Sequence, residues 1–332
     1  APDAALGPLL VAFALHAAGD DEAAEREFAR GLERLDPRER TRAERIDLLL
    51  RARERSLFRS LPADERDAYL DAFWRLADPL WLTPANEART EHLARHLWTR
   101  LLAAAPRVHG MTPWGEDMAE LTIRYGVPVD RERISGFWSS EVPLLEHFDS
   151  LQLAFAPANL RTGGLPPPPL PGADWPLDEP AARSGHHPTT VRRIRELPHQ
   201  VSRFPDGDSV LVRIDADFPL DSAARGAPSI LTGLFLLDAG HRPALDRRAE
   251  TTPQSDTVRF TAHTRVAPGD FTYGVEALEP RSRLAARARY PLTIPAPTPD
   301  SLSLSDVVVA RPFGDGALPG HRFDPRPPPP PT

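Results

Sequence analysis

The sequence contains no cysteine and no lysine, and each absence removes whole classes of chemistry. Without cysteine there is no disulfide, thiolate zinc site, iron–sulfur cluster or cysteine nucleophile. All 40 basic residues are arginine, which also excludes a Schiff-base lysine and the lysine of a Walker-type phosphate loop. No run of ~18 uninterrupted apolar residues occurs, so the chain is not expected to cross a membrane itself. We expect no cofactor and no metal.

Proline, in contrast, is in excess. The 39 prolines among 332 residues are more than twice the usual share of ~5%, so much of the chain must run as loops or extended segments. Hydrophobic residues (41%) and charged residues (26%) have ordinary globular shares, and the length suits two domains. Residues 1–150 hold 27 acidic side chains and 20 Arg, whereas residues 151–332 hold 20 of each. Neither half has the basic excess that nucleic-acid binding needs.

Residues 1–59 are predicted to be helical and to resemble a tetratricopeptide hairpin. An apolar stretch ends at Gly19, after which Ala24, Phe28 and Leu32 recur every fourth residue. One such helical pair is typical of a single repeat, although a solenoid needs ~3 or more repeats.

Residues 60–155 form a second predicted segment. One helix is expected to run through Tyr69–Trp74, and another over Asn86–Ala105 with Thr83 as its cap. Ala119–Tyr125 is predicted to be a short strand.

Ordered blocks between residues 60 and 130 resemble the GWxTD-domain proteins of bacteria. The matching residues are Phe73-Trp74, Asp78-Pro79, Thr83-Pro84-Ala85-Asn86-Glu87, Trp114 with Asp117, and Ile123-Arg124-Tyr125-Gly126-Val127-Pro128. The signature departs from the family at two positions, because Pro113 stands in place of a glycine and Glu116 in place of a threonine. The resemblance implies an envelope protein with a helical N-terminus and a β-sandwich C-terminus. It implies no established activity, and no catalytic residue is carried over.

Four residues of this segment are candidates for a groove: Trp114, Asp117, Arg124 and Tyr125. On one interpretation the aromatic side chains close a small core, and Asp117 accepts hydrogen bonds within it. On the other, the four side chains line a ligand-binding groove, and the protein is a free-standing periplasmic binding module.

The rest of the chain is predicted to contain a proline-rich linker (156–188), a β-sandwich of immunoglobulin type (189–311) and a proline-rich tail (312–332). The sandwich prediction rests on short segments, at regular spacing, in which apolar and polar residues alternate. The expected strands are Ser209–Phe218, Ser229–Leu237, Thr257–Thr264, Phe271–Leu278, Arg283–Ile294 and Asp306–Ala310. The predicted fold class is therefore α+β with several domains.

Two kinds of surface are candidates for partner binding. One is the side of an expected strand that carries Arg283, Arg287 and Arg289. This side is either a solvated outer face or a stripe that binds carboxylates of a partner or anionic lipid head groups. Extended proline segments enter aromatic grooves at low entropic cost. The residues concerned are Pro166, Pro167, Pro168, Pro169, Arg322, Arg326, Pro327 and Pro328.

Metal and nucleophile motifs are weak. His92 and His96 have the i, i+4 spacing of two metal ligands but lack a third, so a solvated helix face is expected for them. The adjacent His186 and His187 point apart in an extended segment. No G-x-S-x-G elbow occurs, and a metal-free hydrolase is therefore the least favoured function.

We expect a noncatalytic, exported accessory or scaffold subunit that contacts other proteins of a membrane-associated assembly. Respiratory, photosynthetic, secretion and outer-membrane assemblies all fit, and contact with a membrane surface is left open. The small-residue start Ala1-Pro2-Asp3 is typical of a processed signal peptide and points to the periplasm, although an incomplete sequence would begin in the same way.

Overall fold

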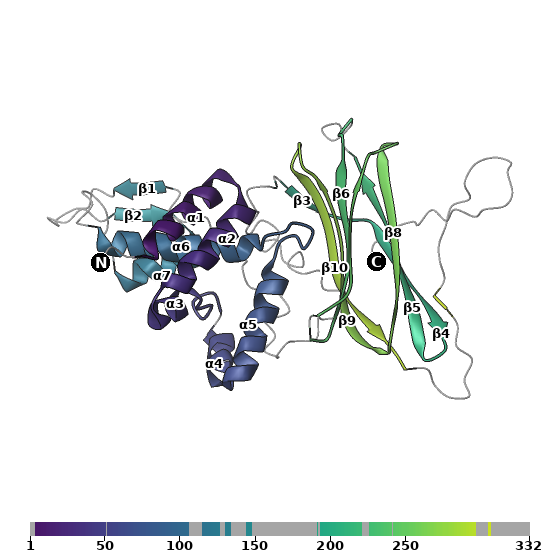
Figure 1. The fold of residues 1–332 in the computed structure, drawn as a ribbon, viewed down its shortest axis with the longest axis horizontal. Coiled ribbons are helices and arrows are strands. Elements are labelled where there is room, and N and C mark those ends of the chain that lie inside the picture. The colour runs from purple at the N-terminus through teal and green to yellow at the C-terminus, as the bar shows by residue number, and fades with distance from the viewer. Residues whose placement is uncertain are drawn as a thin grey trace. The chain divides into compact units, whose positions relative to one another are not determined.

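The computed structural model describes residues 4–50, 52–105, 115–126, 130–133, 144–147, 191, 193–220, 226–240, 242–296 and 305–306. Helices occupy the N-terminal part and two β-sheets the C-terminal part, which confirms the α+β class at this level (Figure 1). The chain divides into two compact units. The first, here the helical unit, contains the helices of the described residues; the second, the two-sheet unit, contains the two C-terminal sheets together with the short segment Leu80–Leu82.

The helical unit starts with the expected pair, α1 (Leu6–Ala18) and α2 (Asp21–Arg34). Gly19 ends α1 in a left-handed conformation (φ 85°), which glycine adopts without steric cost. The Asp20 carboxylate then accepts the backbone N–H of Ala23 and begins α2. Apolar residues of α1, α2 and a later helix form one core: Ala5, Leu9, Ala12, Ala24, Phe28, Leu32, Leu93, Ala94 and Leu97.

Among the described residues, five further helices and one antiparallel pair of strands belong to this unit. They are α3 (Pro37–Ala43), α4 (Ala52–Ser60), α5 (Ala63–Ala77), α6 (Glu87–Ala104), α7 (Glu116–Tyr125), β1 (Asp130–Arg133) and β2 (Leu144–His147). The cap of α6 is Asn86 rather than Thr83, because the Asn86 side chain accepts the backbone N–H of Arg89 at 2.9 Å.

The predicted strand at Ala119–Tyr125 is wrong, since this segment belongs to helix α7. Its buried residues Thr122 and Ile123 follow the half-buried Met118 and Ala119 by four positions, which is helical spacing. Glu116 and Asp117 at the start of α7 also favour a helix, because acidic residues there complement its dipole.

Eight strands of the two-sheet unit lie in the described part of the chain. They are β3 (Arg193–Glu196), β4 (His199–Asp206), β5 (Ser209–Pro219), β6 (Ile230–Asp238), β7 (Pro243–Thr251), β8 (Thr257–Val266), β9 (Gly269–Glu279) and β10 (Leu284–Ile294). One sheet has the order β3-β10-β9-β6-β7 and the other β4-β5-β8; of the strand pairs described, β3–β10 is parallel and the others are antiparallel. Residues from both sheets, among them Ile214, Phe218, Leu234 and Val275, form one core between them.

Five expected strands are confirmed as β5, β6, β8, β9 and β10. Of the sixth, Asp306–Ala310, only Asp306 is described, and its backbone N–H donates to the Arg203 carbonyl of β4 at 3.0 Å. Strands β3, β4 and β7 were not predicted. None of the helices in the described part of the chain is long and apolar enough to span a membrane.

Candidate functional site

The candidate groove residues lie on or next to α7. Asp117, Arg124 and Tyr125 belong to this helix, in which positions 117 and 124 share a face. Trp114 and the side chains of the other three lie outside the described residues. The groove therefore stays a prediction.

The arginine stripe is not the exposed surface expected from its sequence. Arg283 is exposed, in the turn before β10, with a left-handed backbone (φ 57°). Arg287 and Arg289, in contrast, are only 2% and 1% exposed. The prediction of a solvated face or a free docking stripe is wrong for these two residues.

Arg289 is buried because the segment Leu80–Leu82 and a strand carboxylate enclose it. The carboxylate is that of Glu276 on β9, which is fully buried. Its Oε1 accepts hydrogen bonds from Arg289 Nε (3.0 Å) and Nη2 (2.6 Å), and its Oε2 accepts the backbone N–H of Leu82 at 2.8 Å. The Arg289 guanidinium carbon also lies 3.9 Å from the centroid of the Trp81 ring. A buried ion pair needs such additional partners to offset its desolvation.

Two strand glycines make room for this segment. Gly274 is the register partner of Arg289, and Gly233 is that of Glu276. A Cβ atom on Gly274 would lie 2.5 Å from Trp81 Cζ3, and one on Gly233 would lie 2.5 Å from Phe235 Cε2 and 3.0 Å from Leu82 Cδ1. Since a glycine inside a strand often marks a close approach, these two positions are the sequence signal that this face is covered.

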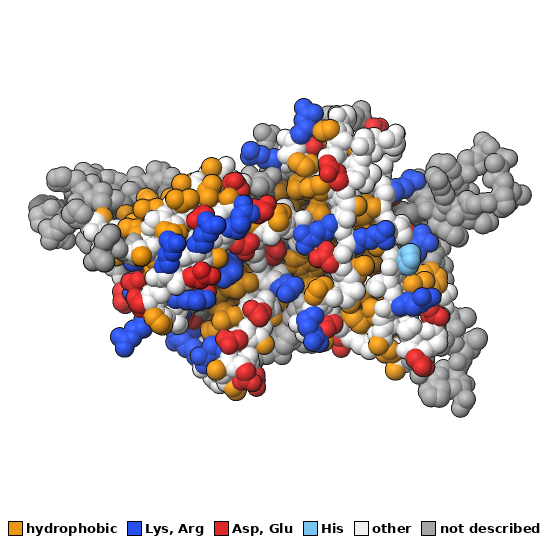
Figure 2. Space-filling model, in the orientation of Figure 1, with side chains coloured by type: hydrophobic (Ala, Val, Ile, Leu, Met, Phe, Trp, Pro, Cys, Tyr) orange, Lys and Arg blue, Asp and Glu red, His pale blue; other side chains and the backbone are white. Residues whose placement is uncertain are grey.

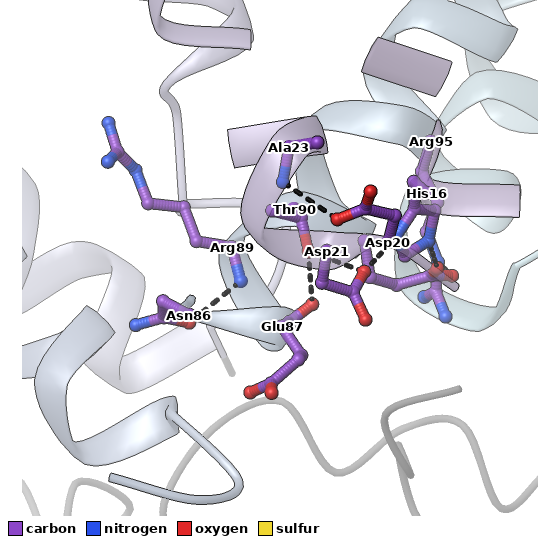
Figure 3. Close-up of polar contacts among 10 residues, drawn as sticks. His16, Asp20, Asp21, Ala23, Asn86, Glu87, Arg89, Thr90 and Arg95 are labelled. Atoms are coloured by element: carbon purple, nitrogen blue, oxygen red, sulfur yellow. Dashed lines mark hydrogen bonds and ion pairs between the residues drawn. The ribbon is translucent and has the colours of Figure 1, made fainter. Parts of the chain in front are cut away.

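A second buried cluster joins four helices of the helical unit, and Figure 3 shows part of it. His16, near the end of α1, contacts Asp21 Oδ1 through Nδ1 at 2.7 Å and Glu91 Oε2 through Nε2 at 2.6 Å. Arg95 donates from Nε to Glu91 Oε1 at 2.6 Å and from Nη1 to the Ile123 carbonyl at 3.1 Å. The chain of contacts thus runs from α2 through α1 and α6 to α7.

His16 is held as an imidazolium, because each ring nitrogen faces a carboxylate and must donate to it. Burial alone would lower the pKa of His16, but the hydrogen bonds to Asp21 and Glu91 outweigh it and raise the pKa to about 9. With both nitrogens donating, His16 offers no lone pair to a metal or a substrate proton. In the sequence of α1, His16 is a polar side chain in an otherwise apolar helix, four and seven positions after Ala12 and Leu9; this spacing hints that His16 is buried but does not identify its partners.

His92 and His96 do not form a solvated helix face, so that prediction is also wrong. His92 is fully buried, and its ring lies 4.5 Å from that of His96 and 5.1 Å from that of Trp74. Burial is the main cause that lowers the pKa of both histidines, that of His96 to about 4. The two imidazoles are therefore neutral members of an aromatic cluster, packed edge to face.

A third polar cluster connects the two sheets. His199 on β4 donates from Nδ1 to the Leu197 carbonyl (2.8 Å), so its Nε2 accepts the hydroxyl of Tyr273 on β9 (2.7 Å). Tyr290 stacks on the His199 ring and donates to Glu196 Oε1 at 2.9 Å. A tyrosine with a histidine acceptor has the geometry of a nucleophile and its base, but Tyr273 is only 8% exposed and belongs to the core between the sheets. The contact fastens one sheet to the other.

The remaining predicted site residues lie outside the described part of the chain: Pro166, Pro167, Pro168, Pro169, His186, His187, Arg322, Arg326, Pro327 and Pro328. Within the described part, no group of three or more His, Asp and Glu side chains is arranged to hold a metal ion. On the face of the molecule in Figure 2, basic and acidic side chains are interspersed over both units.

Comparison with known proteins adds no assignment, since no protein-family model and no curated protein matches the chain. The resemblance to GWxTD-domain proteins therefore stays a prediction.

Proposed function

We propose that this protein is a noncatalytic, exported accessory subunit that holds other proteins together in a membrane-associated assembly. In this proposal the α1–α2 pair is a tetratricopeptide-like hairpin and the two-sheet unit is an immunoglobulin-like sandwich, both common carriers of protein contacts. The envelope location comes from the resemblance in residues 60–130.

The observation that carries the proposal is the exposed apolar side of α1. This helix contains no Asp, Glu or Arg. Leu10 (41%) and Val11 (50%) are the exposed large hydrophobic residues in the described part of the chain, and apolar side chains gather over this part of the helical unit in Figure 2. Gly7 and Ala14 extend the same exposed stripe. A helix that is apolar on all sides is normally covered, so this face suits a partner protein.

The buried polar clusters support a structural role as well. His16 fastens α1 to α2 and α6, Glu276 fastens Leu82 and Arg289, and His199 fastens the two sheets. In each cluster the polar atoms are used to hold elements of the fold together.

The double variant Leu10→Gln/Val11→Gln tests the proposal, because it removes the apolar contact at exposed positions without changing the charge. We expect its melting temperature to match that of the native chain, while its retention in the assembly during washing falls. Glu33→Gln/Arg34→Gln, at exposed positions of α2, is the control with the same net charge and should be retained like the native chain. Equal retention of both variants would count against α1 as the contact.

Removal of residues 321–332 tests the predicted contact of the proline-rich tail. The shortened chain should fold normally and should leave the assembly at lower salt than the full chain. If it resists rising salt equally well, the tail makes no contact and that part of the proposal fails.

A further inference from the structure

Strand β7 has an exposed edge. It is the last strand of the order β3-β10-β9-β6-β7, and among the described residues it pairs only with β6. Every residue of β7 is exposed apart from the half-buried Leu245 and Thr251. A long exposed edge is a template for another strand, since its backbone N–H and C=O groups are free to pair.

The backbone direction shows which residues offer these groups. The N–H of Asp238 donates to the Arg242 carbonyl at 2.9 Å. The register shift between Leu236 and Leu237 places the extra residue on β7, so alternate residues of β6, counted back from Asp238, face β7. Their register partners Leu245, Arg247 and Ala249 face β6 in return. The backbone groups that point to the open edge are therefore those of the residues in between, which are Asp246, Arg248 and Glu250.

The charged side chains of β7 are complementary to those of a second β7 that lies antiparallel to it. If a second β7 lies antiparallel with the two-fold axis at Arg247, then Asp246 of each copy stands opposite Arg248 of the other. A shift by two residues keeps the backbone groups aligned but places Asp246 opposite Asp246, or Arg248 opposite Arg248. Opposite charges across strands are favourable and like charges are not. The side chains therefore favour the register centred on Arg247, in which the two copies of β7 pair over their full length.

We propose that β7 is the docking site for β7 of a second copy of this chain, which joins the two five-stranded sheets into one continuous sheet. The proposal is independent of the function proposed above. Asp246 and Arg248 pair within one chain at 3.0 Å, and Arg248 also lies over the Phe235 ring; because both side chains are exposed, each can exchange its partner for the same group on a facing strand. One contact opposes the dimer, because the two Arg247 side chains meet on the other face of the sheet.

Sedimentation of the full chain tests the proposal through charge reversal. The native chain should form a dimer that weakens with salt. Asp246→Arg and Arg248→Asp should each raise the dissociation constant ~10-fold or more, because each places like charges opposite one another. An equimolar mixture of the two variants should dimerise again, since the copies are then complementary, and Arg247→Gln should tighten the dimer.

The control is Glu22→Arg on α2, which makes the same charge change at an exposed position and should leave the dimer intact. A native chain that is monomeric at its highest soluble concentration would overturn the proposal. So would a mixture of the two variants that does not associate, or a loss of dimer in Glu22→Arg equal to that in Asp246→Arg.

Discussion

The guanidinium carbon of Arg289 lies 3.9 Å from the centroid of the Trp81 ring, and the same guanidinium is paired with the buried Glu276. Trp81 also packs edge to face on Phe235 of β6, with ring centroids 5.7 Å apart. A segment that the sequence places among helices is therefore a structural part of the two-sheet unit. Three interactions hold it: a cation–π contact, an aromatic pair and the hydrogen bond from the Leu82 N–H to Glu276.

Replacing Trp81 by alanine should destabilise the two-sheet unit by about 3 kcal/mol, because the substitution removes a buried indole and uncovers Arg289. Hydrogen exchange of the β9 and β10 amides, read by mass spectrometry, measures this loss locally. Trp98→Ala, the same substitution in the helical unit, should leave these amides protected. Equal protection in Trp81→Ala and the native chain would show that the segment contributes nothing to the sheet.

Glu276→Gln should also cost about 3 kcal/mol, because it leaves the Arg289 charge buried without a counter-ion. Glu250→Gln on the exposed strand β7 is the matched substitution and should change the free energy of unfolding little. The double variant Glu276→Met/Arg289→Met should recover part of the loss, since it removes both charges but leaves the Leu82 N–H without its acceptor. Denaturant titration distinguishes these outcomes, and a double variant no more stable than Glu276→Gln contradicts the account.

The His16 cluster predicts a loss of stability at alkaline pH. The pKa of His16 is raised from 6.5 to about 9 in the folded chain, so the stabilisation is complete below pH 6.5 and is lost as the pH rises through about 9. A shift of this size corresponds to about 3 kcal/mol. Thermal unfolding of His16→Gln across this range should show a flatter pH dependence than the native chain. Parallel curves for the two proteins would refute the imidazolium assignment.

His92 and His96 predict the opposite dependence at acid pH. Burial first, and then the charges of Arg42 and Arg45, lower the pKa of His96 to about 4, although Asp47 offsets part of the effect. Between pH 6.5 and about 4 the unfolded chain binds protons that the folded chain excludes, so stability is lost as the pH falls through this window. In His92→Leu/His96→Leu the stability should depend less on pH across the window, measured as the free energy of unfolding. An unchanged slope would show that these rings are accessible to protons.

The α+β organisation, the first helical pair and five strands followed from the sequence, because each depends on local periodicity. Helix α7 was mistaken for a strand, since Ala119–Tyr125 alone does not separate a period of two from one of 3.6. Strand β7 was not predicted for another reason. Its residues are almost all exposed, so the alternation of buried and exposed side chains that marks a strand is absent.

The buried polar clusters could not be predicted from local pattern. Arg287 and Arg289 alternate with apolar residues, which is also the pattern of a strand with one exposed face. That Arg289 is covered follows only from its contacts with Trp81 and Glu276 and from the Leu82 N–H bound to Glu276, and Trp81 and Leu82 are distant in the sequence. Likewise, the partners of His16 come from other helices, so their meeting depends on the packing of α1 against α2 and α6. Strand glycines at 233 and 274 were the available hint, and they mark close approach without naming the neighbour.

Purification of the full chain from native membranes under gentle solubilisation, followed by native mass spectrometry, tests the proposed function most directly. The account predicts that the chain is recovered with other proteins in fixed stoichiometry, and that Leu10→Gln/Val11→Gln reduces their amount while Glu33→Gln/Arg34→Gln does not. Recovery of the native chain alone, as a monomer or a homodimer without other proteins, would contradict the central claim.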